Sequence, residues 1–429
     1  MAHSLKRQAV ILTLGNVFTR GLGFALHLLF ARLMGAEALG VMELAHSVGM
    51  LALTPVTAGV SPAISRLTAG RPNADQPQVL RAGLCLIRRI ALVVMAVMLL
   101  VSPAVSVLLG DLRTLPAILA DVPSLLLLGL CSVYSGYCCG RQDTVTPALN
   151  ECLEQTARFL LSTVLLLVVG SGNMALAAAL PEVAEMAAAV LALGMFIRSA
   201  GWPRSLAVPS RALQKEIVQL CIPSALSRVC VTAMRTLNAV LLPVCLRRSG
   251  LSAAAATAQF GLFNGMAMPL LMLPGVATGA VCMVSVPAMS RLEHQPKRLR
   301  KIALQLIGTA AGIGTAAALV LSLGAKMISI HLYAQPALMP LLRLMAPVSI
   351  LMALQQVTGG MIAGLGLQRR SLTGTLLSAA MMLVLTALLA PMPGVRLFGA
   401  AIATMAGQGV GLVWNMGVLI HAGVLKGKR

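Results

Sequence analysis

The sequence predicts an all-α polytopic membrane protein with about twelve transmembrane helices in two parallel six-helix lobes. Composition, the spacing of apolar windows and the placement of basic residues lead to this fold class. Of 429 residues, 58% are hydrophobic and 10% are charged, and the mean hydropathy is +0.90. Soluble proteins carry about a quarter of their residues as charges, so the composition excludes a mainly soluble enzyme or binding protein.

Apolar windows long enough to cross a membrane recur along the whole chain. A hydrocarbon core of about 30 Å requires about 20 helical residues. Charged or Gly/Pro-rich breaks separate the expected spans, which are 8–32, 39–63, 88–110, 116–139, 146–169, 174–197, 216–246, 253–289, 302–324, 336–365, 371–390 and 398–423. The eighth and tenth windows exceed one crossing, which indicates tilt, a kink or a cytoplasmic extension.

The basic residues fix the expected orientation. Lys and Arg in short loops stay on the cytoplasmic side, and most of the 33 fall on the side that holds both termini. We therefore expect a cell-membrane protein with cytoplasmic termini and an uncleaved first helix. The formal net charge of +21 is then a topology and anionic-lipid signal, and no nucleic acid partner is expected.

An internal duplication predicts the two lobes. Pro62–Leu67 recurs as Pro287–Leu292 at an offset of 225, and Val133–Gly140 recurs weakly as Val357–Gly364 at an offset of 224. Both echoes fall at the cytoplasmic ends of equivalent spans, so the repeat is six helices and the halves are parallel. The expected domains are an N-terminal lobe over 1–200, a cytoplasmic linker over 201–215 and a C-terminal lobe over 216–429, with a cleft between the lobes.

Three arginines lie inside expected spans without an acid three or four residues away. Arg20 is near the middle of the first span, with Asn16 and His27 on its face, and Arg228 and Arg235 share a face of the seventh. Their counter-charge must come from another helix or from a ligand. Guanidinium binds phosphate with two parallel hydrogen bonds, so we expect a basic cleft for an anionic, phosphate-bearing substrate. Interlobe salt bridges and snorkelling are the structural alternatives.

Other polar residues in the spans have two interpretations each. Asn264 in the eighth span either contacts substrate or bonds to a neighbouring helix. The charged groups of the fifth and sixth spans serve either structural pairing or the coupling of an ion or proton, and they are Glu151, Glu154, Arg158, Glu182 and Glu185. Sequence spacing places the first three on one helical face, where they can pair internally.

Nothing in the sequence indicates catalysis. No HExxH, facing aspartate pair or Ser/His/Asp set at one depth is present, so no catalytic residues are expected. The nine cysteines have no metal-site spacing, so no metal or cofactor is expected. Gly407, Gly409 and Gly411 predict close helix packing rather than a phosphate loop, since no strand precedes them.

Four stretches carry a resemblance to a known family: Ala31–Gly40, Gly59–Leu67, Glu154–Arg158 and Gly360–Gly366. Together they resemble the polysaccharide-biosynthesis branch of the multidrug/oligosaccharidyl-lipid/polysaccharide exporter superfamily, which includes lipid II flippases and sporulation proteins. The resemblance implies a V-shaped transporter that moves a polyprenyl-pyrophosphate saccharide or peptidoglycan precursor from the inner to the outer leaflet by alternating access. It also implies that Arg20 contacts the pyrophosphate, and that cell-wall synthesis proteins are possible partners.

The sequence departs from that family in two respects. Many relatives have fourteen spans, so a groove for the lipid tail is in doubt here. The first and seventh spans lack the acid of cation-coupled drug exporters, which disfavours export of small amphipathic compounds or drugs. That export and a non-transporting scaffold for cell-wall synthesis remain the alternatives.

Overall fold

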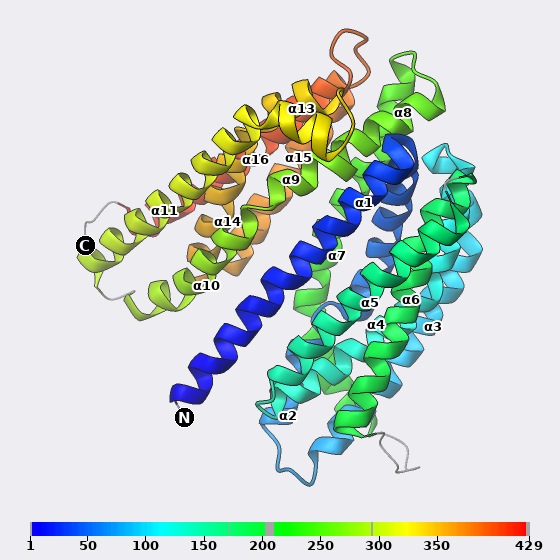
Figure 1. The fold of residues 1–429 in the computed structure, drawn as a ribbon. Coiled ribbons are helices and arrows are strands. Elements are labelled where there is room, and N and C mark those ends of the chain that lie inside the picture. The colour runs from blue at the N-terminus through cyan, green and yellow to red at the C-terminus, as the bar shows by residue number, and fades with distance from the viewer. Residues whose placement is uncertain (1, 171, 202–209, 293–294, 426–429) are drawn as a thin grey trace. The chain divides into compact units, whose positions relative to one another are not determined.

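The computed structural model describes residues 2–170, 172–201, 210–292 and 295–425, and in this part of the chain every regular element is helical (Figure 1). The predicted all-α membrane class is confirmed. The elements in order are α1 (Ala2–Thr57), α2 (Val60–Ala69), α3 (Gln76–Leu109), η1 (Leu112–Thr114), α4 (Leu115–Gly140), α5 (Val145–Val169), α6 (Met174–Ala200), α7 (Arg211–Arg248), α8 (Ala253–Phe260), η2 (Gly261–Ala267), α9 (Met268–Met272), α10 (Gly275–Leu292), α11 (Pro296–Leu323), α12 (Ala325–Met327), η3 (Ile328–Leu332), α13 (Leu338–Met345), α14 (Val348–Gly364), α15 (Gln368–Leu389) and α16 (Leu397–His421).

Among the described residues, ten helices are long and apolar enough to cross a membrane, or eleven if the bent pair α13 and α14 forms one span. The first of these runs over Gly15–Ala69, which is 55 residues. At 1.5 Å per residue it is about 82 Å long, well over twice the hydrocarbon thickness. Gly35 interrupts it with φ 79° and ψ 179°, a conformation that favours glycine. This segment therefore contains the second expected span and most of the first.

Cα packing divides the chain into two compact units. Unit 1 is Met1–Met34 with Val41–Thr236, and unit 2 is Gly35–Gly40 with Leu237–Arg429. The change from one unit to the other thus falls inside α7. Residues 202–209, most of the expected linker, lie outside the described residues, and the division into lobes at 201–215 stays a prediction.

Each unit has its own apolar core. In unit 1 the core joins α2, α3, α4, α6 and α7, and the rings of Tyr134 and Phe196 stack there with centroids 5.9 Å apart. In unit 2 it joins α10, α11, α14 and α16.

The two sequence echoes meet each other inside each unit. In unit 1, a Cβ added to Gly136 of α4 would lie 2.5 Å from the carbonyl oxygen of Ser61 and 3.0 Å from Ile64, both on α2. In unit 2, a Cβ on Gly364 of α14 would lie 2.5 Å from the carbonyl oxygen of Val286 and 3.0 Å from Met289, both on α10. The echoes are therefore two sides of one glycine-mediated helix contact that occurs in both units.

This contact refines the alignment of the repeat. Ser61 and Val286 are 225 residues apart, as are Ile64 and Met289, whereas Gly136 and Gly364 are 228 apart. The sequence comparison instead aligned Gly136 with Gly360. In the structure, the weaker echo is displaced by about one helical turn relative to the stronger one.

Candidate functional site

A group of ionisable side chains gathers among the transmembrane helices of unit 1. We call it the charge cluster, and its members are His27, Glu43 and His46 of α1, Asp121 of α4, Glu154 and Arg158 of α5, and Glu182 and Glu185 of α6. Ionisable residues are costly at this depth, so they mark a function or a specific structural need.

Helical spacing and small residues bring these side chains together. Glu43 and His46 are three residues apart on α1, and Glu182 and Glu185 are three apart on α6, so each pair shares one helix face. α6 is rich in buried alanines, such as Ala177, which allow close approach to α4 and α5.

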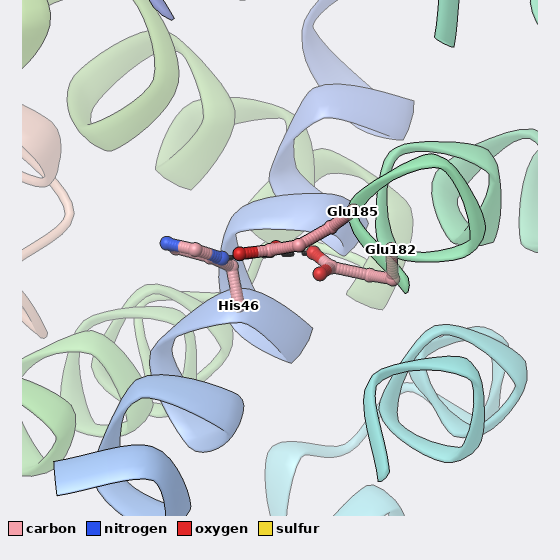
Figure 2. Close-up of side chains that lie close together, drawn as sticks. All are labelled: His46, Glu182 and Glu185. Carbon is pink, nitrogen blue, oxygen red and sulfur yellow. Dashed lines mark ion pairs between the residues drawn. The ribbon is translucent and has the colours of Figure 1, made fainter. Parts of the chain in front are cut away.

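Two ion pairs form the centre of the cluster. A terminal nitrogen of Arg158 lies 3.0 Å from Oε2 of Glu185, with side chains 17% and 13% exposed. His46 Nδ1 lies 3.6 Å from Oε1 of Glu182, which is 2% exposed. Figure 2 shows the polar ends of His46, Glu182 and Glu185 converging from the two helices. The pair made by Arg158 joins two helices. The sequence left two sets of partners open, Glu151 and Glu154 within α5 or Glu182 and Glu185 on the next helix, and the structure has Glu185.

Two further contacts extend the cluster. His27 Nδ1 lies 3.3 Å from Oε1 of Glu43, and the His27 side chain is about one-third exposed. The hydroxyl of Ser124 donates to Asp121 Oδ1 at 2.5 Å. The Asp121 carboxylate occupies the space where Gly49 lacks a side chain. Asp121 and Glu154 also lie within electrostatic range of Arg158.

Acidic groups outnumber basic groups in the cluster. Five carboxyl groups face one guanidinium and two imidazoles. Glu182 Oε2 is buried and, within the described residues, has no hydrogen-bond partner. Three potential metal-ligand atoms lie within 4.8 Å of one another: a ring nitrogen of His46 and one carboxylate oxygen each of Glu182 and Glu185. Buried net charge is unfavourable, so this arrangement suits the uptake of a proton or a metal cation.

The expected substrate arginines lie elsewhere in unit 1. Arg20 on α1 and Arg228 and Arg235 on α7 are all exposed. Within the described part of the chain, none of the three makes an ion pair or side-chain hydrogen bond. The salt-bridge alternative is therefore not realised among these residues.

The remaining expected site residues have varied surroundings. Asn16 is half-buried beside Arg20 along α1, and its carbonyl oxygen accepts a bond from Thr19. His27, expected at a substrate site, pairs with Glu43 in the charge cluster. Asn264 is half-buried in the π-helical segment η2 of unit 2. Glu151 is exposed and makes no ion pair among the described residues.

Glu43, His46 and Asp121 were not among the site residues expected from the sequence. Glu43 and His46 have the i, i+3 spacing of one helix face inside a span, which is a usable signal. Asp121 stands alone on its helix, so only the packing of α4 against α6 reveals its place in the cluster.

The helical architecture is that of known multi-pass transporters. MurJ, a lipid II flippase in an inward closed conformation, superposes with a TM-score of 0.77 at 13% identity, over 97% of this chain and 89% of that chain. A multidrug resistance MATE family transporter of the MOP superfamily, in an inward-facing conformation, gives a TM-score of 0.71 at 19% identity, over 95% of each chain. These likenesses establish the fold class, a membrane transporter fold.

Sequence comparison then gives the family. The chain belongs to the polysaccharide biosynthesis protein family, whose model matches residues 5–293. Stage V sporulation protein B of Bacillus subtilis is 27% identical over 427 residues, which cover 94% of this chain and 81% of that protein. The family resemblance in the sequence is confirmed, and relatives that are transporters and flippases agree with the expectation that the chain is not an enzyme.

Proposed function

We propose that this protein is a flippase that moves a polyprenyl-pyrophosphate saccharide or peptidoglycan precursor from the inner to the outer leaflet by alternating access. In this proposal Arg20, Arg228 and Arg235 bind the pyrophosphate while the polyprenyl tail stays in the lipid. The name of one structural neighbour, a lipid II flippase, agrees with a lipid-linked wall precursor as substrate.

The observation that carries the proposal is that these arginines lie in membrane-spanning helices without a counter-charge among the described residues. All three lie in membrane-spanning helices, and within the described residues no protein group neutralises them. An uncompensated guanidinium in a span is unfavourable unless water or an anionic ligand reaches it. A pyrophosphate supplies the missing charge and accepts paired hydrogen bonds from the planar guanidinium.

We further propose that the charge cluster couples a cation, most simply a proton, to this movement. The supporting observations are the surplus of carboxyl groups around Arg158 and the buried Oε2 of Glu182, which has no hydrogen-bond partner in the described part of the chain. Protonation or release at Glu182 would change the attraction between α1 and α6 through His46. Transport in proteoliposomes should then respond to an imposed proton gradient, and Glu182→Gln should remove that response while leaving gradient-free movement measurable.

The primary test measures leaflet exposure of a fluorescent polyprenyl-pyrophosphate saccharide in proteoliposomes. We expect Arg20→Ala, and the double change Arg228→Ala with Arg235→Ala, to slow protein-dependent movement by roughly 10- to 100-fold, the value of one or two charge-assisted bonds. Arg20→Lys should restore only part of the rate because lysine lacks the planar fork. Arg211→Gln, an exposed arginine at the start of α7, is the matched control and should be silent.

Two outcomes would reject the flippase. Movement that is equal with and without protein, across several saccharides, would favour a scaffold for cell-wall synthesis. Full activity of the arginine variants alongside transport of small amphipathic cations would favour the exporter.

A further inference from the structure

A groove opens on the surface of unit 2 where α15 and α16 pack together. Its volume is about 830 Å³, within the usual range of ligand sites. The lining residues that matter most are Arg370, Trp414, Gly409, Gly417 and His421. None of the residues named above for substrate or coupling lines this groove.

The groove has one basic end and a long apolar floor. Arg370 begins α15 and His421 ends α16, and because the helices are antiparallel both stand at the same end. From there the lining follows one stripe of α16 back to Ala406, with Val410 and Val413 between. These 16 residues rise about 22 Å, more than the roughly 15 Å depth of one leaflet.

The glycines of α16 separate into two sets with different surroundings. A Cβ on Gly407 would meet Ser378 and Met382 of α15, and one on Gly411 would meet Gln355 of α14, so these two permit helix packing. A Cβ on Gly409 or Gly417 would meet nothing within 4 Å. The sequence predicted helix packing for all three glycines of the run, but packing does not explain Gly409. Because Gly409 has no side chain, the groove is deeper at this position.

The basic end is fixed in place by Trp414. Its indole Nε1 donates to the carbonyl oxygen of Arg370 at 2.9 Å. The ring packs against α15 where Gly374 lacks a side chain. Arg370 and His421 make no ion pair among the described residues, and no acidic residue lines the groove. A cationic end, an indole at the polar boundary and an apolar floor match an anionic amphiphile.

We infer that this groove binds one anionic phospholipid, with its phosphate at Arg370 and His421 and an acyl chain along Ala406–Gly417 of α16. The positive-inside pattern places this end at the cytoplasmic leaflet, where anionic lipids attract basic residues. This lipid is a bound partner and not the transported molecule, so the inference is independent of the flippase proposal.

Tryptophan fluorescence offers a direct test. The chain has two tryptophans, so Trp202→Phe leaves Trp414 as the single reporter. The full-length protein in nanodiscs would be titrated with phosphatidylglycerol or phosphatidylcholine carrying brominated acyl chains, because bromine quenches indole on contact. We expect phosphatidylglycerol to reach half-maximal quenching at a mole fraction several-fold lower than phosphatidylcholine does.

Variants locate the effect in the groove. Arg370→Gln should reduce the preference for phosphatidylglycerol by roughly fivefold, the effect of one basic residue at an anionic membrane. Arg369→Gln removes the same charge one residue away, outside the groove lining, and should change little. Gly409→Leu and Gly417→Leu should lower quenching by both lipids, and the open space at each glycine predicts that these variants fold.

Three results would overturn the inference: equal quenching by the two lipids, an equal effect of Arg369→Gln and Arg370→Gln, or relief of quenching by unlabelled polyprenyl pyrophosphate at a lower mole fraction than by unlabelled phosphatidylglycerol. The last would assign the groove to the transported substrate instead. None of these readouts depends on transport, so the flippase proposal stands or falls separately.

Discussion

Arg158 of α5 and Glu185 of α6 form a buried ion pair, with 3.0 Å between the guanidinium nitrogen and the carboxylate oxygen. Both side chains are more than four-fifths buried. If one partner is removed, water therefore cannot fully hydrate the charge that remains. The pair links α5 to α6, and Glu182 lies three residues before Glu185 on α6.

Removing one partner of this pair should cost more than removing both. We expect Arg158→Leu to lower the free energy of unfolding by about 3–5 kcal/mol, because it leaves several buried carboxylates without their guanidinium. The double change Arg158→Leu with Glu185→Leu should cost less than Arg158→Leu alone. Thermal melting in detergent, followed by circular dichroism, measures the order of these effects, and strictly additive losses would show that the two residues are not coupled.

Gly49 should be intolerant of any side chain. A Cβ there would overlap the carboxylate of Asp121, so Gly49→Ala should cost about 1–3 kcal/mol of stability. Asp121→Ser in the same chain should recover much of the loss because it removes the colliding oxygens. Gly23→Ala, on the same helix with nothing within 4 Å, is the control and should be neutral or slightly stabilising. Comparable losses for both alanine variants would show that backbone entropy, and not the collision, governs this helix.

The His46–Glu182 pair should make stability depend on pH with a defined sign. The attraction requires the imidazolium form of His46, so it weakens as rising pH removes the imidazole proton. The free energy of unfolding of the wild type should therefore exceed that of His46→Gln by about 1 kcal/mol near pH 6, and by less near pH 9. Melting temperatures of the two proteins across this range test the sign. The control is His331→Gln, which changes an exposed histidine of unit 2 and should show no such trend. If the difference between wild type and His46→Gln does not change with pH, the ion pair does not account for it.

The sequence predicted the membrane class and most spans because these depend on summed hydrophobicity along one helix. It identified Arg158, Glu182 and Glu185 as unusual for the same reason, since a charge in an apolar window is visible without a structure. It could not show that Arg158 pairs with α6, because the rotation of neighbouring helices decides which side chains meet. Likewise, the break at Gly35 depends on a backbone conformation that glycine permits but does not require.

The repeated glycine contact gives the last prediction. A Cβ added at Gly136 or at Gly364 would lie 2.5 Å from an equivalent backbone carbonyl oxygen, that of Ser61 or of Val286. Gly136→Ala and Gly364→Ala should each destabilise the protein by about 1–3 kcal/mol, because the carbonyl oxygen belongs to a helix backbone that cannot rotate away. Gly308→Ala and Gly312→Ala on α11, with nothing within 4 Å, are the controls for the loss of glycine itself. If only one of the two contact glycines is sensitive, the contact is not a shared element of the duplication. If both are, the offset of 228 between them should guide the alignment of the halves in preference to the offset of 224.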